Sequence, residues 1–194
     1  MFTLKIIVGI SGASGSIYGI RTLEALRDHG VETHLIISKW AEATINIETP
    51  YTAKEVKKMA SVVYSSADQA AKISSGSFKV DGMIVAPCSM KTLASIAHGL
   101  ADNLITRTAD VTLKKKRKLV MLPREAPLND IHIENMLKLS RMGAVMFPPM
   151  PAFYNFPKTI DDIINHTISR LLDQFKIEND LTKRWKEDEQ SVNA

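Results

Sequence analysis

Cysteine is nearly absent from this sequence, which has Cys88 alone among its 194 residues. One thiol excludes an intramolecular disulfide and any zinc site built from several cysteines. Long hydrophobic runs are also lacking, and the N-terminus has no basic stretch leading into an apolar one. We therefore expect no signal peptide and no membrane contact. Together with the single thiol, this favours a reducing, cytoplasmic location.

Positive charge is in modest excess, with a net charge of +4, and much of it lies in the run from Lys114 to Lys118. Such a run can contact nucleic acid or an anionic substrate. No aromatic residues are interleaved with it and no nucleic-acid-binding motif surrounds it, so we expect no nucleic-acid partner. We interpret most of the run as the solvated end of a helix that leads into a strand.

Short apolar segments rich in β-branched residues alternate with segments of helical periodicity. This alternation predicts an α/β fold with a mainly parallel sheet between two layers of helices. The length suits one domain, residues 1–194, with a polar tail from about residue 179 that we expect to be loosely held. The expected strands are 5–10, 31–37, 82–86, 118–122 and 144–147; the expected helices are 15–28, 89–98, 129–141 and one from about 159, with two or three more within 41–79.

The first candidate binding segment is the glycine turn from Gly9 to Gly15. Ligands of open parallel sheets bind beyond the carboxyl ends of the strands, and a turn that opens a helix there suits an anion. The glycine spacing fits neither the dinucleotide fingerprint nor a P-loop. Ser38 and Lys39 follow the second strand, where NAD-binding folds place an acidic residue. The sequence disfavours NAD and leaves two alternatives, a mononucleotide site or simple strand-to-helix packing.

Two other strand ends carry groups that suit a phosphate. The segment 87–92 places hydroxyls and free N–H groups at a helix start, either as an anion site or as an ordinary cap at Ser89. No histidine is placed to activate Cys88, which we expect to be a small buried residue. Prolines flank Arg124 and Glu125. The guanidinium suits a phosphate and the carboxylate can act as an acid or base, with a surface ion pair as the alternative.

The last two candidates lie in the C-terminal part of the chain. The loop 148–154 combines three prolines with two aromatic residues, so it could wall a ring-shaped cofactor or an apolar substrate, or pack against a neighbouring subunit. Arg170 lies at the edge of the apolar stripe of the last helix. A cation there needs a partner or a ligand, unless its side chain extends to solvent.

Four of these segments, taken together, resemble the flavin prenyltransferases of the UbiX/Pad1 type. They are Gly-Ile-Ser-Gly-Ala-Ser-Gly (9–15), Pro-Cys-Ser-Met-Lys-Thr-Leu-Ala (87–94), Pro-Arg-Glu-Ala-Pro-Leu (123–128) and Pro-Pro-Met-Pro-Ala-Phe-Tyr (148–154). The similarity runs in order from about Lys5 to Phe175. Within the family it is nearest to the version encoded beside hydroxyarylic (phenolic) acid decarboxylases.

The resemblance implies a Rossmann-like fold, usually in a dodecamer, and an enzyme that needs no metal. The implied reaction transfers a dimethylallyl group from dimethylallyl phosphate to N5 and C6 of reduced FMN, with the pyrophosphate as the alternative donor. The product, prenylated FMN, would serve a separate decarboxylase of the UbiD type.

By motif match, the resemblance also implies roles for individual residues. Ser14, Glu48 and Glu125 would be catalytic, with Ser14 near N5 of the flavin. Glu125 would protonate the departing phosphate or remove a proton in ring closure. Dimethylallyl phosphate would meet Arg107, Lys114, Tyr154 and Arg170, some of them from neighbouring subunits. FMN would be held by Gly12, Ala13, Ser14, Ser38, Ser89, Met90, Lys91, Thr92 and Arg124.

Two alternatives belong to other functional classes. A flavin-dependent cysteine decarboxylase typically carries a Pro-x-Met-Asn motif, whereas this chain has Pro-Cys-Ser-Met at 87–90. An accessory subunit that only binds FMN would stabilise a decarboxylase without catalysis. Such a subunit would not need the set Lys114, Glu125, Tyr154 and Arg170, so we favour prenyl transfer.

Overall fold

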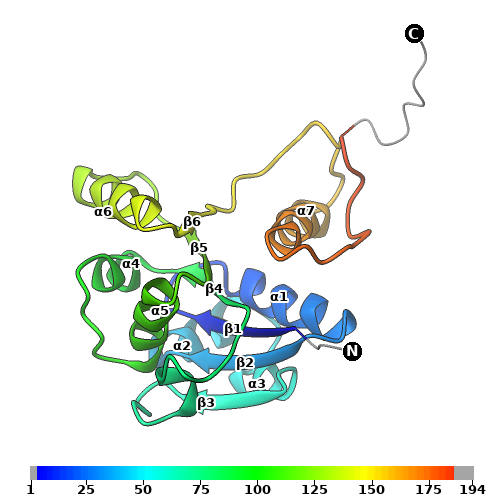
Figure 1. The fold of residues 1–194 in the computed structure, drawn as a ribbon. Helices are drawn as coiled ribbons and strands as arrows, with labels where there is room; N and C mark the ends of the chain where they lie inside the picture. Colours follow the sequence, from blue (N-terminus) through cyan, green and yellow to red (C-terminus); the bar gives the residue numbers. More distant parts are fainter. Residues whose placement is uncertain (1–3, 186–194) are drawn as a thin grey trace, which may run out of the picture. The chain divides into compact units, whose positions relative to one another are not determined.

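The fold is built on one six-stranded sheet in a computed structural model, which describes residues 4–185. All the strand pairings are parallel, and the order is β3-β2-β1-β4-β5-β6, from the bottom of Figure 1 to the top. The parallel sheet predicted from the alternating pattern is confirmed. The strands are β1 (Lys5–Ile10), β2 (Glu32–Ile37), β3 (Val62–Ser65), β4 (Gly82–Cys88), β5 (Lys118–Pro123) and β6 (Val145–Met146).

Helices connect the strands and form the outer layers. Because parallel crossovers are right-handed, a chain that moves from β1 towards β3 and later from β4 towards β6 places its two sets of helices on opposite faces. The first set is α1 (Ser16–Asp28), α2 (Lys39–Glu48) and α3 (Ala53–Lys58). The second is α4 (Met90–Ala97), α5 (Leu104–Lys114) and α6 (Asp130–Arg141), and a short 3₁₀ turn, η1 (Lys72–Ser74), precedes β4.

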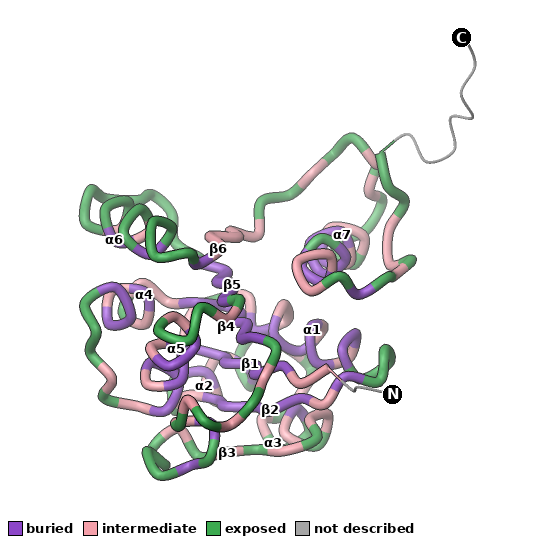
Figure 2. Tube along the Cα trace, viewed as in Figure 1, coloured by how far each residue is buried: buried purple, intermediate pink, exposed green. Residues whose placement is uncertain are grey.

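The core lies along the central strands. β1 pairs with β2 on one side and β4 on the other, so that Val8 lies opposite both Leu35 and Ile84, and all three side chains are fully buried. Each such side chain contributes about 1.5–3 kcal/mol through burial. Figure 2 shows the contrast with α6, most of whose residues are exposed. The sheet therefore gives a rigid base to the loops at the carboxyl ends of its strands.

The chain divides into two compact units between Pro148 and Pro149. The first contains the sheet and helices α1 to α6; the second contains the proline-rich loop and α7 (Ile160–Asp173). The predicted start of the last helix is confirmed, since the Thr159 hydroxyl accepts a hydrogen bond from the Asp162 N–H at 3.1 Å. The single domain stays a prediction, as does the loosely held tail, whose residues 186–194 lie outside the described ones.

The segment 41–79 differs from its expected content. It contains the expected helices and also β3, which the sequence pattern did not predict. β3 has only four residues and alternates between half-buried and exposed positions because it forms the edge of the sheet. Such a short alternation gives a weak periodic signal. At the other edge, β6 is shorter than the expected strand 144–147.

Candidate functional site

Three loops meet at the carboxyl edge of the sheet, after β1, β2 and β4. Ser11 ties the first to the third: its hydroxyl donates to the Pro87 carbonyl at 2.9 Å and accepts the Ser89 N–H at 2.8 Å. The Ser38 N–H donates to the Ile10 carbonyl at 3.0 Å, which ties the first loop to the second. These bonds bring the glycine turn, the start of α2 and the start of α4 together, as the strand-end rule predicted.

The glycine turn carries a hydrogen-bonded serine–carboxylate pair. The Ser14 hydroxyl lies 2.9 Å from Oε2 of Glu48, which comes from the last turn of α2. The same carboxylate accepts the Gly15 N–H at 3.0 Å and the Ser16 hydroxyl at 3.1 Å. The structure thus brings together two of the residues expected to be catalytic, Ser14 and Glu48.

The charge of Glu48 is stabilised by these donors. Burial by itself would raise the pKa of its carboxyl, but the bonds from the Gly15 N–H and from the Ser14 and Ser16 hydroxyls outweigh burial and hold the pKa below its ordinary value. The N-terminus of α1, which favours an anion, therefore already holds one from the chain itself.

Serine residues cap both α2 and α4. Ser38 Oγ accepts the Ala41 N–H at 3.1 Å, and Ser89 Oγ accepts the Thr92 N–H at 3.2 Å. A cap satisfies one of the four N–H groups that a helix start leaves without an intrahelical partner, so others remain available to a ligand. At α4 these include the N–H groups of Met90 and Lys91. Arg124 lies beside this helix start, since its N–H donates to the Cys88 carbonyl at 3.2 Å.

Gly12 shows how closely the glycine turn approaches α2. A Cβ atom built on Gly12 would lie 2.4 Å from Cβ of Trp40, a separation that side chains do not reach. The turn can pass there only with glycine, next to Ala13 and Ser14. The site offers half-buried backbone, two helix starts, serine hydroxyls and a guanidinium. This donor set suits the phosphate and the polar ring edge of FMN. The residues expected to hold FMN therefore fit that group.

Glu125 and Arg124 follow β5 and are both exposed. The Glu125 carboxylate accepts the N–H of the next residue, Ala126, at 3.1 Å. Within residues 4–185, no ion pair joins Arg124 to Glu125, so the surface-pair alternative finds no support. Both side chains remain available to a ligand.

Arg107 and Lys114 lie two turns apart on α5, about 10 Å along its axis. α5 begins beside the carboxyl end of β3, where the Leu104 N–H donates to the Ser66 carbonyl at 2.8 Å. It ends just before β5 begins, so Lys114 lies towards the amino edge of the sheet, at the far end of the helix from the glycine turn. Arg107 pairs with Asp110 at 3.2 Å. Within one subunit the structure does not bring Lys114 to the three loops.

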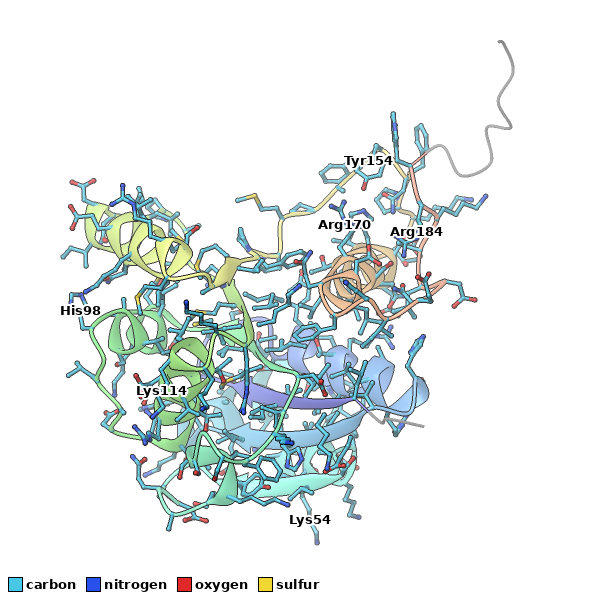
Figure 3. All side chains as sticks on the ribbon, viewed as in Figure 1. Lys54, His98, Lys114, Tyr154, Arg170 and Arg184 are labelled. Atoms are coloured by element: carbon cyan, nitrogen blue, oxygen red, sulfur yellow. The ribbon has the colours of Figure 1, made fainter. Side chains whose placement is uncertain are left out.

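Tyr154 and Arg170 lie together in the second unit. Arg170 Nη1 donates to the Tyr154 hydroxyl at 3.5 Å, and Figure 3 labels both residues. The same hydroxyl lies 2.7 Å from Nε2 of His166. Arg170 is exposed, as its position at the edge of an apolar stripe predicts, and Tyr154 is exposed as well. A cation at position 170 was expected to need a partner, and that partner is Tyr154. The resemblance had assigned both residues to the same ligand, dimethylallyl phosphate.

Sequence reasoning missed four residues that organise these clusters: Ser11, Ser16, Thr44 and His166. Oγ1 of Thr44 lies 3.0 Å from the Ser16 hydroxyl oxygen. Helical spacing could have found two of the four, because Thr44 lies four residues before Glu48 and His166 lies four residues before Arg170, which places each pair on one helix face. Ser11 and Ser16 act across loops, and spacing along the chain carries no such signal.

Cys88 is fully buried, as expected of a small core residue, and burial raises the pKa of its thiol far above the ordinary value. Within residues 4–185, no three His, Cys, Asp or Glu side chains gather in a way that could hold a metal ion. In the same part of the chain, no helix is long and apolar enough to cross a bilayer.

Comparison with known proteins gives consistent matches. The Flavoprotein family model matches residues 2–172. A probable UbiX-like flavin prenyltransferase of Escherichia coli O157:H7 is 59% identical over 183 residues, which cover 94% of this chain and 93% of that protein.

Two solved structures are similar over nearly the whole chain. One is AnUbiX (PadA1) in complex with FMN and dimethylallyl pyrophosphate, with a TM-score of 0.94, 52% identity, and coverage of 95% of this chain and 98% of that one. The other is a dodecameric FMN-dependent UbiX-like decarboxylase from Escherichia coli O157:H7, with a TM-score of 0.92, 59% identity, and coverage of 94% and 99%.

Proposed function

We propose a function for this chain from the premise that it belongs to the Flavoprotein family and, within it, to the UbiX-like flavin prenyltransferases. It is an enzyme that transfers a dimethylallyl group from dimethylallyl phosphate to N5 and C6 of reduced FMN. FMN is the acceptor and is converted to prenylated FMN. The resemblance carried by four loop segments is confirmed by similarity across more than nine-tenths of the chain.

The observation in the structure that best supports this chemistry is the Ser14–Glu48 pair. Because Glu48 is held ionised, the Ser14 proton is donated to it, and Ser14 Oγ faces a ligand as an acceptor. A reduced flavin carries a proton on N5, which such an acceptor can bind. That proton must leave when N5 forms a bond to carbon, and Ser14 with Glu48 can take it.

The phosphate of FMN is assigned to Ser38, to the α4 start from Ser89 to Thr92, and to Arg124. This follows from the three tied loops and from the occupation of the α1 start by Glu48. Gly12 and Ala13 then lie against the flavin ring, where a close backbone is an advantage. Met90 and Lys91 contribute their N–H groups at the helix start.

The phosphate of the prenyl donor is assigned to Arg107, Lys114, Tyr154 and Arg170. When the allylic C–O bond breaks, the electron pair leaves with the phosphate, and cations stabilise the growing negative charge. Glu125 is assigned the proton transfer to the departing phosphate or the removal of a proton on ring closure. Its exposed position past β5 leaves it free for either role.

The position of Lys114 supports an assembled enzyme. Because it lies at the opposite end of α5 from the glycine turn, we assign it to the donor site of a neighbouring copy in a homo-oligomer, which we expect to be a dodecamer. A mixture of Lys114→Ala subunits with Glu48→Gln subunits should then regain activity, since some sites receive both intact residues. Mixed assemblies no more active than the parents would contradict the assignment.

Prenylated FMN requires a consumer, and we assign that role to a separate decarboxylase of the UbiD type in the cytoplasm. The lone buried thiol suits a reducing compartment. Co-incubation of the reaction product with an apo-decarboxylase should restore decarboxylation, and FMN alone should not.

Mass spectrometry of the flavin tests the proposed reaction directly. Incubation with reduced FMN and dimethylallyl phosphate should raise the flavin mass by one prenyl unit, and inorganic phosphate should be released in equal amount. An unchanged mass would contradict prenyl transfer. Bound but unaltered FMN would indicate an accessory flavin-binding subunit, and decarboxylation of a cysteine-terminated peptide would indicate a cysteine decarboxylase.

A further inference from the structure

His166 is a buried imidazole in the second unit that has no role in the reaction described so far. It is 7% exposed and lies on α7, one turn before Arg170. Its Nε2 atom is 2.7 Å from the Tyr154 hydroxyl, and its ring packs edge-on against the tyrosine ring, with centroids 5.4 Å apart. A side chain buried this far keeps its polar atoms only where they have partners.

Counting donors and acceptors at the Tyr154 oxygen narrows what His166 can do. Arg170 is a guanidinium and can only donate, and its Nη1 lies 3.5 Å from this oxygen. If His166 also donates from Nε2, both protein neighbours give protons to the oxygen. The single phenolic proton then has no acceptor among these two side chains and is left for a ligand.

The charge state of His166 is consistent with this arrangement. Burial, and then the positive charge of Arg170, hold the pKa of the imidazole below its ordinary value. A neutral imidazole carries one proton, on Nε2 or on Nδ1. With the proton on Nε2, the imidazole donates to the tyrosine oxygen, and the phenolic proton is free for donation to a ligand. An anion suits this position because it can only accept hydrogen bonds.

We propose that His166 is a positioning residue for the prenyl donor: its Nε2–H donates to the Tyr154 oxygen and directs the phenolic proton to the phosphate that Arg170 also binds. This inference rests on the proposed function, because it takes Tyr154 and Arg170 as phosphate ligands. The ring of Tyr154 is held by two edge-on ring contacts, one with Trp185 at 5.2 Å between centroids and one with His166. The imidazole therefore sets the direction of the hydroxyl, which ring packing alone does not.

A set of four variants separates this role from simple packing. His166→Phe keeps an aromatic ring and loses the donor. His166→Gln restores an amide N–H near the position of Nε2. Tyr154→Phe removes the hydroxyl on which His166 acts, and the double variant Tyr154→Phe/His166→Phe closes a thermodynamic cycle. Thr167→Val, at a buried position of the same helix, is the matched control for disturbance of α7.

Binding is measured by calorimetry, with dimethylallyl phosphate titrated into the full-length protein loaded with oxidised FMN, so that no turnover is needed. We expect His166→Phe to weaken binding about tenfold and His166→Gln to recover most of that loss. The double variant should bind no more weakly than Tyr154→Phe alone. In steady-state assays the KM for the donor should rise while kcat changes little.

Wild-type affinity in His166→Phe would overturn the inference, as would a double variant in which the two losses add. Equal losses in Thr167→Val and His166→Phe would also overturn it, since the effect would then be general loosening of α7. A different result would contradict the proposed reaction. If the wild-type protein binds the donor in this cycle yet never changes the flavin mass, the role of His166 in binding stands and prenyl transfer falls.

Discussion

The glycine turn after β1 and the Arg124–Glu125 segment after β5 lie at the same edge of one sheet, yet they differ in how their polar groups are satisfied. At the glycine turn, Glu48 already accepts bonds from Ser14, Gly15 and Ser16. After β5, the Glu125 carboxylate accepts one bond from its own neighbour. The first region is organised without a ligand, whereas the second keeps exposed groups that we propose a ligand contacts.

This difference agrees with the two roles that we propose for these regions. A group that must hold a fixed charge and direct a proton benefits from preorganised donors, because they need no rearrangement during the reaction. A group that meets a mobile, strongly anionic substrate benefits from staying exposed until that substrate binds. Substitutions in the two regions should therefore fail in different ways.

The largest effect is expected from Glu48→Gln. The amide replaces one carboxylate oxygen with a donor that faces the N–H of Gly15 and the hydroxyls of Ser14 and Ser16, and it can no longer take a proton. Prenyl transfer should slow about 100-fold or more, with FMN affinity nearly unchanged, as measured by single-turnover flavin absorbance.

Glu42→Gln is the control for this change, since Glu42 lies on the same helix and pairs with Lys57 at the surface. It should leave the rate near that of the wild type. Full activity in Glu48→Gln would erase the proposed contrast, because the organised carboxylate would then be structural only.

A smaller loss is expected from Glu125→Gln. It removes an exposed acid or base without disturbing an existing network, so FMN should bind normally and turnover should fall about tenfold to 100-fold. The measurement is kcat together with a flavin titration. If FMN binding is lost and turnover of bound flavin is normal, Glu125 holds the cofactor and its assignment to proton transfer is wrong.

Gly12→Ala tests how rigidly the organised region is built. The new Cβ would lie 2.4 Å from Cβ of Trp40, so the turn or the start of α2 must move. We expect a loss of about 1–3 kcal/mol in stability and weaker FMN binding. Gly9→Ala is the comparison, since its Cβ would meet Cγ2 of the buried Ile105 side chain at 3.3 Å, a close contact that needs a smaller shift than the one at Gly12. Equal tolerance of both would mean that the turn is more adaptable than its contacts suggest.

The sequence predicts the sheet well because its strands are buried on both faces and read as continuous apolar runs. β1, β2, β4 and β5 lie within a residue or two of their expected ranges. The sequence pattern did not predict β3, because a four-residue edge strand has neither a long apolar run nor a long alternation. Local rules also find the caps at Ser89 and Thr159, since a cap acts on residues close to it in the chain.

The site is less accessible to such rules. The strand-end rule selects the right segments, but the Ser14–Glu48 and Ser11–Ser89 contacts join residues 34 and 78 positions apart. Residue spacing carries no information about these pairs; only the resemblance placed Glu48 near the site. The link between His166 and Tyr154 is equally invisible, because it depends on how a proline-rich loop folds over the helix that follows it.

The smallest expected effect concerns pH and isolates the charge of Glu48. Its pKa in the folded protein is lower than in the unfolded chain, where it is about 4.3. The ionised form therefore adds stability that is fully present above about pH 5 and is lost as the pH falls through the folded-state pKa.

Because the carboxylate is largely exposed, this contribution is only about 0.5 kcal/mol, or about 1–2 °C in Tm. The gap in Tm between the wild type and Glu48→Gln, measured at one protein concentration, should be constant near neutral pH. It should narrow once the pH falls below about 4.3 and close as the pH passes through the lower folded-state pKa. A gap that persists unchanged into acid would show that the three donors stabilise the side chain through packing rather than through its charge, and the glycine turn would then be no more organised around a fixed charge than the segment after β5.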